Sequence, residues 1–203
     1  MVYLVWRLSD RKPFAAKAFK NIPTRYDVEE CLFMQKIRDR FILGSIDCFI
    51  NTDRKNYDEL VIITELALYD VENYVLKTLK DQNIDEEEVK IILAQVFIAV
   101  SALHRDLKIV HRDLKPANIL IFDDMKVKLS DFGFLKEIDT SKIIMSKCCT
   151  PMFTSPDVLG IVRGNVLPFK IDVYSLGLTA CWMVTKSNTF LEDIKAKNIV
   201  FPH

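Results

Sequence analysis

Short apolar runs separated by turn residues occupy the first third of the chain. Two such runs flank the polar turn 9–13, whose Asp10 and Pro13 predict a hairpin. A polar stretch over 51–58 precedes a run rich in β-branched residues, which is typical of a buried strand. One helix is predicted in this region, over 26–38. The predicted strands are 2–8, 14–19, 41–50 and 60–63.

Helical periodicity replaces this pattern further along the chain. The acidic run 85–88 predicts a helix start, with Asp85 and Glu88 spaced as a capping-box pair. Apolar residues then recur with a period close to 3.6, and we expect this stripe to pack into the core. A later helix, over 173–184, is apolar on nearly all sides and is predicted to be buried. The stripe consists of Val89, Ile92, Leu93, Val96, Phe97, Val100 and Leu103.

Composition is ordinary for a globular domain, with 50% apolar and 28% charged residues and a net charge of zero. The neutral balance gives no electrostatic reason to expect nucleic acid or a membrane as a partner. Residues 1–6 are apolar, but this run is too short for a signal peptide or a membrane span. The 5 cysteines show no metal-ligand spacing and predict reduced thiols in an intracellular protein.

Three polar residues, Asp113, Lys115 and Asn118, share one predicted loop between two apolar runs. An aspartate at this place can accept a proton from a substrate hydroxyl, and a lysine can steady a transferring phosphate. An asparagine can bind a metal through its carbonyl oxygen. Asp131 follows Asn118 by 13 residues and is itself followed by Phe132 and Gly133.

A predicted hairpin connects the two polar segments. Its strands, 119–122 and 127–129, place Asn118 at the entrance and Asp131 at the exit, on the same edge. Two oxygen ligands can therefore meet around Mg²⁺, which prefers few protein carboxylates together with phosphate oxygens.

The pentapeptide His-Arg-Asp-Leu-Lys occurs twice, at 104–108 and at 111–115. The first copy has a histidine, not a carboxamide, five residues after its Asp106. That copy also closes the predicted helix, where His104 and its neighbouring cations suit the helix dipole. We therefore assign the chemistry to the second copy.

Together, these motifs resemble the catalytic and metal-binding loops of eukaryotic protein kinases, and Lys115 with Thr150 matches the Ser/Thr type. The resemblance implies an α+β, two-lobed fold, with a small antiparallel β lobe over 1–66 and a mainly helical large lobe over 67–203. It implies transfer of the ATP γ-phosphate to Ser or Thr hydroxyls of a protein substrate. The implied cofactors are ATP and Mg²⁺.

The resemblance also assigns roles within the second copy and the hairpin. Asp113 is the implied catalytic aspartate, Lys115 offsets charge on the γ-phosphate, and Arg112 is the residue through which a phosphorylated loop is ordered. Asn118 and Asp131 are the implied metal ligands. In the family, a carboxylate at the position of Asp172 accepts hydrogen bonds from the backbone of this loop.

In the β lobe, Lys17 resembles the kinase lysine that reaches the ATP phosphates, with Lys20 as the competing candidate. Glu30 looks like the helix glutamate that pairs with this lysine, and Glu29 is the alternative.

The segment after the last predicted strand of the β lobe resembles the adenine-binding part of the kinase cleft. Thr64 is the implied gatekeeper beside the adenine pocket, and Glu65 to Ala67 form the implied hinge. Asp70 either contacts the ribose or caps the helix that follows; the sequence favours neither.

Residues 134–149 have the composition of an activation segment, in which Thr140, Ser141 and Ser146 are candidate phosphorylation sites. Residues 149–159 resemble the substrate-docking segment of the family. They depart from it at Cys149, which replaces a glycine, and at Asp157, which replaces a glutamate.

The family's glycine-rich loop and last helices have no counterpart in the sequence, so we expect a fold truncated at both ends. An incomplete record of an active kinase is the favoured interpretation, and a non-catalytic binding or scaffold module is the alternative. A partner or regulatory domain is expected to cover the apolar surface of the large lobe. A cytoplasmic location is expected, with the nucleus as a second one.

Overall fold

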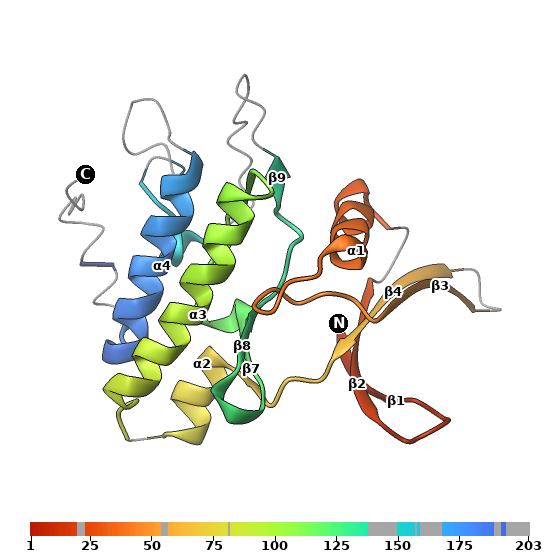
Figure 1. Ribbon diagram of the computed structural model, residues 1–203, viewed down its shortest axis with the longest axis horizontal. Coiled ribbons are helices and arrows are strands. Elements are labelled where there is room, and N and C mark those ends of the chain that lie inside the picture. Colours follow the sequence, from red (N-terminus) through yellow and green to blue (C-terminus); the bar gives the residue numbers. More distant parts are fainter. Residues whose placement is uncertain are drawn as a thin grey trace.

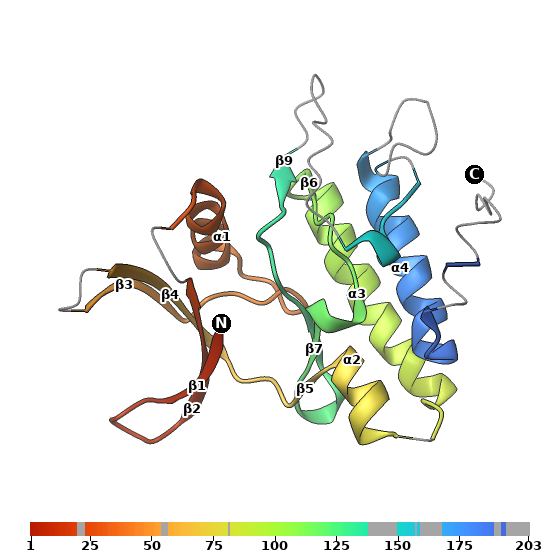
Figure 2. The ribbon, with the colours of Figure 1, turned by 180° about the vertical axis from the view of Figure 1, so that it is seen from behind.

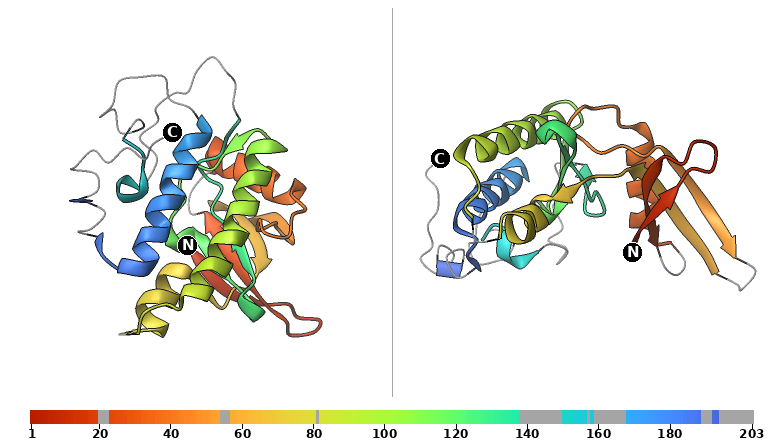
Figure 3. Two further views of the ribbon diagram at one scale, coloured as in Figure 1. Left: turned by 60° about the vertical axis from the view of Figure 1, so that its left-hand side comes forward. Right: turned by 90° about the horizontal axis from the view of Figure 1, so that it is seen from below.

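The computed structural model describes residues 1–19, 23–53, 57–80, 82–137, 150–156, 158, 168–188 and 192–193. An antiparallel sheet with one helix forms one side of the molecule, and a mainly helical part forms the other (Figure 1). The right-hand view of Figure 3 shows the chain crossing between the two parts after β4 (Tyr57–Glu65). Strands and helices are thus segregated, as the predicted α+β class requires.

The sheet has the strand order β1-β2-β4-β3, and every neighbouring pair is antiparallel. β1 (Val2–Trp6) and β2 (Pro13–Phe19) form the predicted hairpin. Along β2, Phe14 and Ala16 are buried whereas Lys17 is half-buried on the opposite face, because successive side chains of a strand alternate. This register directs Lys17 towards the helical part of the molecule.

The predicted strand over 41–50 is wrong in its first half. β3 covers Asp47–Asp53, and the residues before it form an extended connection. There, Leu43 N donates to Leu129 O (2.9 Å) and Leu129 N donates to Phe41 O (2.8 Å). The backbone around Phe41 and Leu43 therefore bonds to the helical part of the molecule, whereas Ile46 N, next to β3, donates to Ile63 O of the sheet (2.7 Å).

The helix of the sheet side, α1, covers Arg25–Lys36 and confirms the predicted helix with a shift at its ends. Thr24 caps it through a reciprocal capping box with Asp27, a signal that the sequence analysis did not use. The buried residues of α1 are Glu30, Cys31 and Met34.

A disulfide joins Cys31 of α1 to Cys48 of β3. The expectation of reduced thiols is therefore wrong for this pair, while Cys181 is free. The two residues are 17 positions apart in the sequence and come together because α1 packs against β3.

The helical part contains two long helices and several short strands. α3 and α4 lie side by side, and the views in Figures 1 and 2 agree on this. Tight 3₁₀ turns at Pro116–Asn118, Asp123–Met125 and Pro151–Phe153 connect some of the elements. The elements are β5 (Tyr69–Asp70), α2 (Val71–Asn73) with a π-helical continuation (Tyr74–Thr78), α3 (Glu86–Arg105), β6 (Ile109–Val110), β7 (Ile119–Ile121), β8 (Val127–Leu129), β9 (Lys136–Glu137) and α4 (Pro168–Thr185).

α3 begins after Asp85, as predicted, but the capping box is wrong. The Asp85 carboxylate accepts from Glu87 N (2.8 Å), and the Glu88 carboxylate accepts from the Tyr74 hydroxyl instead (2.8 Å). Burial, together with this contact, raises the pKa of Tyr74 to about 12. The apolar stripe lies mainly in the core, except that Phe97 is 64% exposed.

α4 buries Leu178 and Met183 in the core. The prediction of a buried helix over 173–184 is confirmed along most of its length, and the exceptions are its two end residues, Val173 (58% exposed) and Val184 (60% exposed). The described part of the chain leaves these two side chains uncovered.

None of the described helices combines the length and the apolar character that crossing a bilayer would require.

Candidate active site

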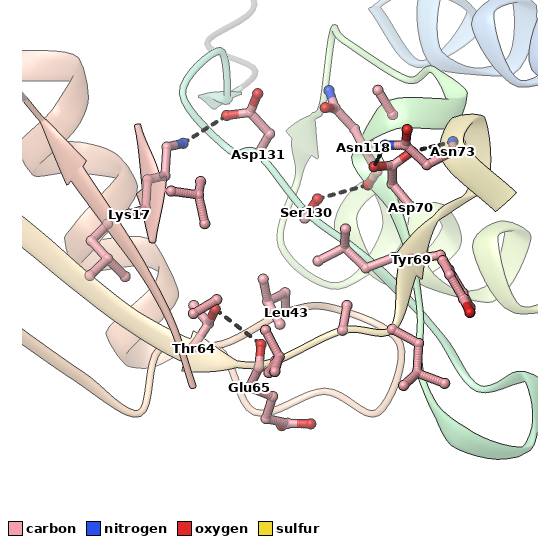
Figure 4. A pocket seen from close by; sticks show the side chains of 18 of the residues that line it. Lys17, Leu43, Thr64, Glu65, Tyr69, Asp70, Asn73, Asn118, Ser130 and Asp131 are labelled. Carbon is pink, nitrogen blue, oxygen red and sulfur yellow. Dashed lines mark hydrogen bonds and ion pairs between the residues drawn. The ribbon is translucent and has the colours of Figure 1, made fainter. Parts of the chain in front are cut away.

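A cleft of about 680 Å³ lies between the sheet and the helical part. Its wall is mainly apolar, with a few polar side chains that come from both parts of the molecule (Figure 4). Such a surface suits a flat, partly apolar ligand that carries a charged end. The polar residues labelled in Figure 4 include Lys17, Thr64, Asp70, Asn118, Ser130 and Asp131.

Lys17 connects the two sides of this cleft. Its Nζ lies 2.7 Å from Glu30 Oε1 of α1 and 2.9 Å from Asp131 Oδ1, which follows β8. Burial lowers the pKa of Lys17, but the two carboxylates outweigh this effect and raise it above its ordinary value. The lysine is therefore a permanent cation at the place where the two parts of the molecule meet.

The structure also shows which of the two candidate glutamates, Glu30 or Glu29, pairs with Lys17. Glu30 is 2% exposed and faces Lys17, whereas Glu29 lies at the surface and pairs with Arg25 Nε (2.6 Å). The competing lysine, Lys20, lies outside the described residues.

The predicted hinge lines the cleft at the end of β4. Thr64 is 7% exposed, and its hydroxyl donates to Glu65 O (3.2 Å). The Glu65 side chain turns to Lys128 Nζ of β8, 2.7 Å away, which connects the sheet to the helical part. Ala67 also lines the cleft. The placement of these residues agrees with the prediction, while contact with adenine remains a prediction.

Asp70 caps α2, which was one of its two predicted roles. Its carboxylate accepts from Asn73 N (2.7 Å) and from the Asn73 side-chain amide. The residue also lines the cleft, as Figure 4 shows, so the ribose contact remains a prediction.

The hairpin of β7 and β8 brings Asn118 and Asp131 to one edge, as predicted. Ser130, just before Asp131, donates to Asn118 O both from its backbone nitrogen (2.9 Å) and from its hydroxyl (3.0 Å). Asn118 Nδ2 donates to Asp113 O (2.8 Å) and Oδ2 (2.9 Å), so its carbonyl oxygen is its remaining ligand atom. One carboxylate and one amide oxygen beside an open cleft fit Mg²⁺ that is completed by phosphate oxygens.

Asp113 is held by a compact set of hydrogen bonds. Lys115 Nζ lies 2.7 Å from its Oδ2, and the Thr150 hydroxyl lies 2.7 Å from its Oδ1. Lys115 Nζ also donates to the Thr150 hydroxyl (2.8 Å), which closes a triangle. Burial raises the pKa of Asp113, but the bonds from Lys115 and Thr150 outweigh burial and lower it, so the carboxylate stays ionised at neutral pH.

The backbone of the same loop is anchored by Asp172 of α4. This fully buried carboxylate accepts from His111 N and Arg112 N, each at 2.8 Å, as predicted. Arg112 has a φ of 73°, a conformation that is strained for a residue with a side chain and that these bonds help to hold. His104 Nε2 lies 2.7 Å from the same carboxylate, so this residue of the first pentapeptide has a partner that the sequence analysis missed.

His111 was also missed. It is fully buried, with Nε2 3.1 Å from Ser130 O and Nδ1 3.3 Å from Asp113 N. These partners suit a neutral ring that donates from Nε2 and accepts at Nδ1. Its place in the motif gave no signal of this role.

The predicted phosphorylation sites Thr140, Ser141 and Ser146 lie outside the described residues, as do Cys149 and Asp157.

Comparisons with known proteins agree with this geometry. The protein kinase domain family matches residues 1–201. The chain is 31% identical over 183 residues to the probable serine/threonine-protein kinase fhkB of Dictyostelium discoideum, covering 88% of this chain and 14% of that protein. It is 34% identical over 150 residues to the serine/threonine-protein kinase cds1 of Schizosaccharomyces pombe, covering 71% of this chain and 32% of that protein.

A solved structure shows the same fold. The crystal structure of the yeast RNA Pol II CTD kinase CTDK-1 complex superposes with a TM-score of 0.78 at 21% identity, covering 92% of this chain and 59% of that chain. The predicted two-lobed α+β fold is thus confirmed. With the family match extending over residues 1–201, the chain belongs to the protein kinase domain family.

Proposed function

We propose that this chain transfers the γ-phosphate of ATP to serine or threonine hydroxyls of a protein substrate. The observation that carries the proposal is the double contact of Lys17 with Glu30 and Asp131. Lys17 and Asp131 are 114 residues apart in the sequence, yet they meet where a triphosphate in the cleft would end. The family membership and the named relatives support the same reaction.

In this proposal the adenine lies against the apolar wall near Thr64, and backbone groups of residues 65–67 would hydrogen-bond it. Lys17 binds phosphate oxygens, and Glu30 keeps its ammonium directed into the cleft. Asn118 and Asp131 would hold Mg²⁺, which neutralises charge on the phosphates when it is bound.

Asp113 orients the substrate hydroxyl. The hydroxyl oxygen forms a bond to the γ-phosphorus, the bond from that phosphorus to ADP breaks, and the hydroxyl proton passes to the Asp113 carboxylate. Lys115 and Thr150 hold this carboxylate before the substrate arrives, so little reorganisation is needed during the reaction. Lys115 also offsets the charge of the transferring group.

The duplicated pentapeptide supplies a matched test. Asp113→Asn removes the ionised carboxylate, and we expect phosphotransfer from Mg-ATP to a degenerate Ser/Thr peptide library to fall by about 10²–10⁴-fold. Asp106→Asn makes the same change in the first copy, where the aspartate is exposed at the end of α3 and pairs with Arg105. We expect that variant to keep the activity of the original protein.

Binding of a fluorescent ATP analogue separates the catalytic role from the nucleotide site. Asp113→Asn should bind the analogue as the original protein does. Full activity in Asp113→Asn, or loss of activity in Asp106→Asn alone, would contradict the assignment. Nucleotide binding without phosphotransfer in the original protein would favour a binding module instead.

A further inference from the structure

The position of α1 determines whether Glu30 reaches Lys17. Only a small buried face holds α1 against the rest of the molecule. Its buried face consists of Glu30, Cys31 and Met34, and Phe33 adds a ring contact to Phe132 with centroids 4.9 Å apart. A helix with few buried apolar contacts shifts at low energetic cost. Exposed apolar side chains of α1 are Tyr26 (64%), Val28 (44%) and Leu32 (47%).

The disulfide between Cys31 and Cys48 strengthens this attachment at the residue next to Glu30. Cys48 belongs to β3, an edge strand of the sheet, so the bond joins the helix that carries Glu30 to the sheet that carries Lys17. The bond therefore acts on the distance between the two partners of the ion pair, which is 2.7 Å in the structure with the disulfide formed.

We propose that Cys31 and Cys48 form a redox-sensitive clamp on α1, which favours the Lys17–Glu30 pair when oxidised and weakens it when reduced. Without the bond, α1 keeps its N-cap and its contact with Phe132, so it stays folded but reaches positions in which Glu30 leaves Lys17. The regulatory consequence rests on the phosphotransfer activity proposed above, whereas the movement of α1 does not.

The chemistry is thiol–disulfide exchange with a low-molecular-weight disulfide such as glutathione disulfide. Cys31 is 6% exposed, whereas Cys48 is only half-buried, so the Cys48 thiolate is the accessible nucleophile. It attacks the small disulfide, forms a mixed disulfide and releases one thiolate. The Cys31 thiolate then displaces the second. Two protein thiols are oxidised, the small disulfide is reduced to two thiols, and the two protons pass to those thiolates.

The test equilibrates the purified chain in glutathione buffers of defined redox ratio, with alkylation and mass spectrometry to measure the Cys31–Cys48 bond. Hydrogen exchange of the α1 amides reports its mobility, and ATP titrations of phosphotransfer give KM and kcat. We expect faster exchange in α1 and a KM for ATP raised about tenfold in the reduced protein.

Two variants provide the controls. Cys48→Ser should behave like the reduced protein in every buffer, because it lacks the accessible sulfur. Cys181→Ser removes the free cysteine of α4 and should respond to oxidation as the original protein does.

These measurements distinguish a failure of the clamp from a failure of the proposed phosphotransfer activity. Failure of the disulfide to form, equal exchange and equal KM in both states, or a lower KM in the reduced state would each overturn the clamp. A change in α1 exchange with no phosphotransfer in either state would support the clamp and overturn the proposed function.

Discussion

At the scale of single residues, the environment of each polar group determines its state. Asp113 is kept ionised by Lys115 and Thr150, although burial acts in the opposite direction. His111 shows the reverse balance: burial lowers its pKa, and the nearby Asp172 carboxylate only partly offsets this. Its contacts with Ser130 O and Asp113 N also suit the neutral ring.

This balance predicts an acid sensitivity that comes from His111. The unfolded chain takes up a proton near pH 6.5, whereas the folded protein takes it up only at lower pH, so the folded state is stabilised above about pH 6.5 and loses stability as the pH falls below it. Denaturant unfolding at pH 7.5 and 5.5 should show this loss. In His111→Gln, which keeps a donor and an acceptor but does not titrate, the loss should be smaller; an equal loss in both proteins would contradict the prediction.

At the scale of elements, the hairpin of β7 and β8 is held by a side chain from α3. Gln95 Nε2 donates to Met125 O (2.8 Å), and Gln95 Oε1 accepts from Val127 N (2.9 Å). The turn before Val127 contains Asp124 and Met125 at positive φ (57° and 53°). One amide side chain therefore satisfies the backbone of a strained turn, in the hairpin that carries Asn118 and Asp131 at its other end.

We expect Gln95→Leu to lower the free energy of unfolding by about 1–3 kcal/mol, because it leaves Val127 N and Met125 O without this partner. Gln95→Glu keeps the acceptor for Val127 N but loses the donor to Met125 O, so its effect should be intermediate. Urea unfolding of the three proteins measures the series. A Gln95→Leu protein as stable as the original would show that the contact contributes nothing.

At the scale of the whole molecule, the cleft exists because the sheet side and the helical part meet. Lys17 to Asp131, Glu65 to Lys128, and the backbone bonds of Leu129 to the connection before β3 all cross between the parts. A nucleotide in the cleft would contact both parts and would therefore stabilise the folded protein as a unit.

Mg-ATP at about 100 times its Kd should stabilise the protein by about 2.7 kcal/mol. For a chain of this size, that corresponds to a rise in Tm of roughly 5–10 °C. Asp131→Ala should abolish the rise, because it removes the proposed metal ligand. Asp123→Ala removes an exposed acid at the other end of the same hairpin and should keep the rise. Equal shifts in both variants, measured by thermal denaturation, would refute the assignment of Asp131.

Local patterns in the sequence were sufficient for much of the fold and for the core of the site. The hairpin of β1 and β2, the start and stripe of α3, and the hairpin between Asn118 and Asp131 all follow from two-residue or 3.6-residue periodicity and turn residues. Periodicity is readable because it reflects the geometry of the backbone within one element. The spacing of Asp113, Lys115 and Asn118 is local in the same sense.

The choice of partners was decided only by the tertiary structure. Glu30 instead of Glu29 faces Lys17, Glu88 binds Tyr74 and not its own helix start, and Cys31 meets Cys48. Each of these contacts joins residues from different elements. A sequence pattern shows which residues are able to pair, whereas the packing of α1 on the sheet and of α3 against its neighbours determines which of them do.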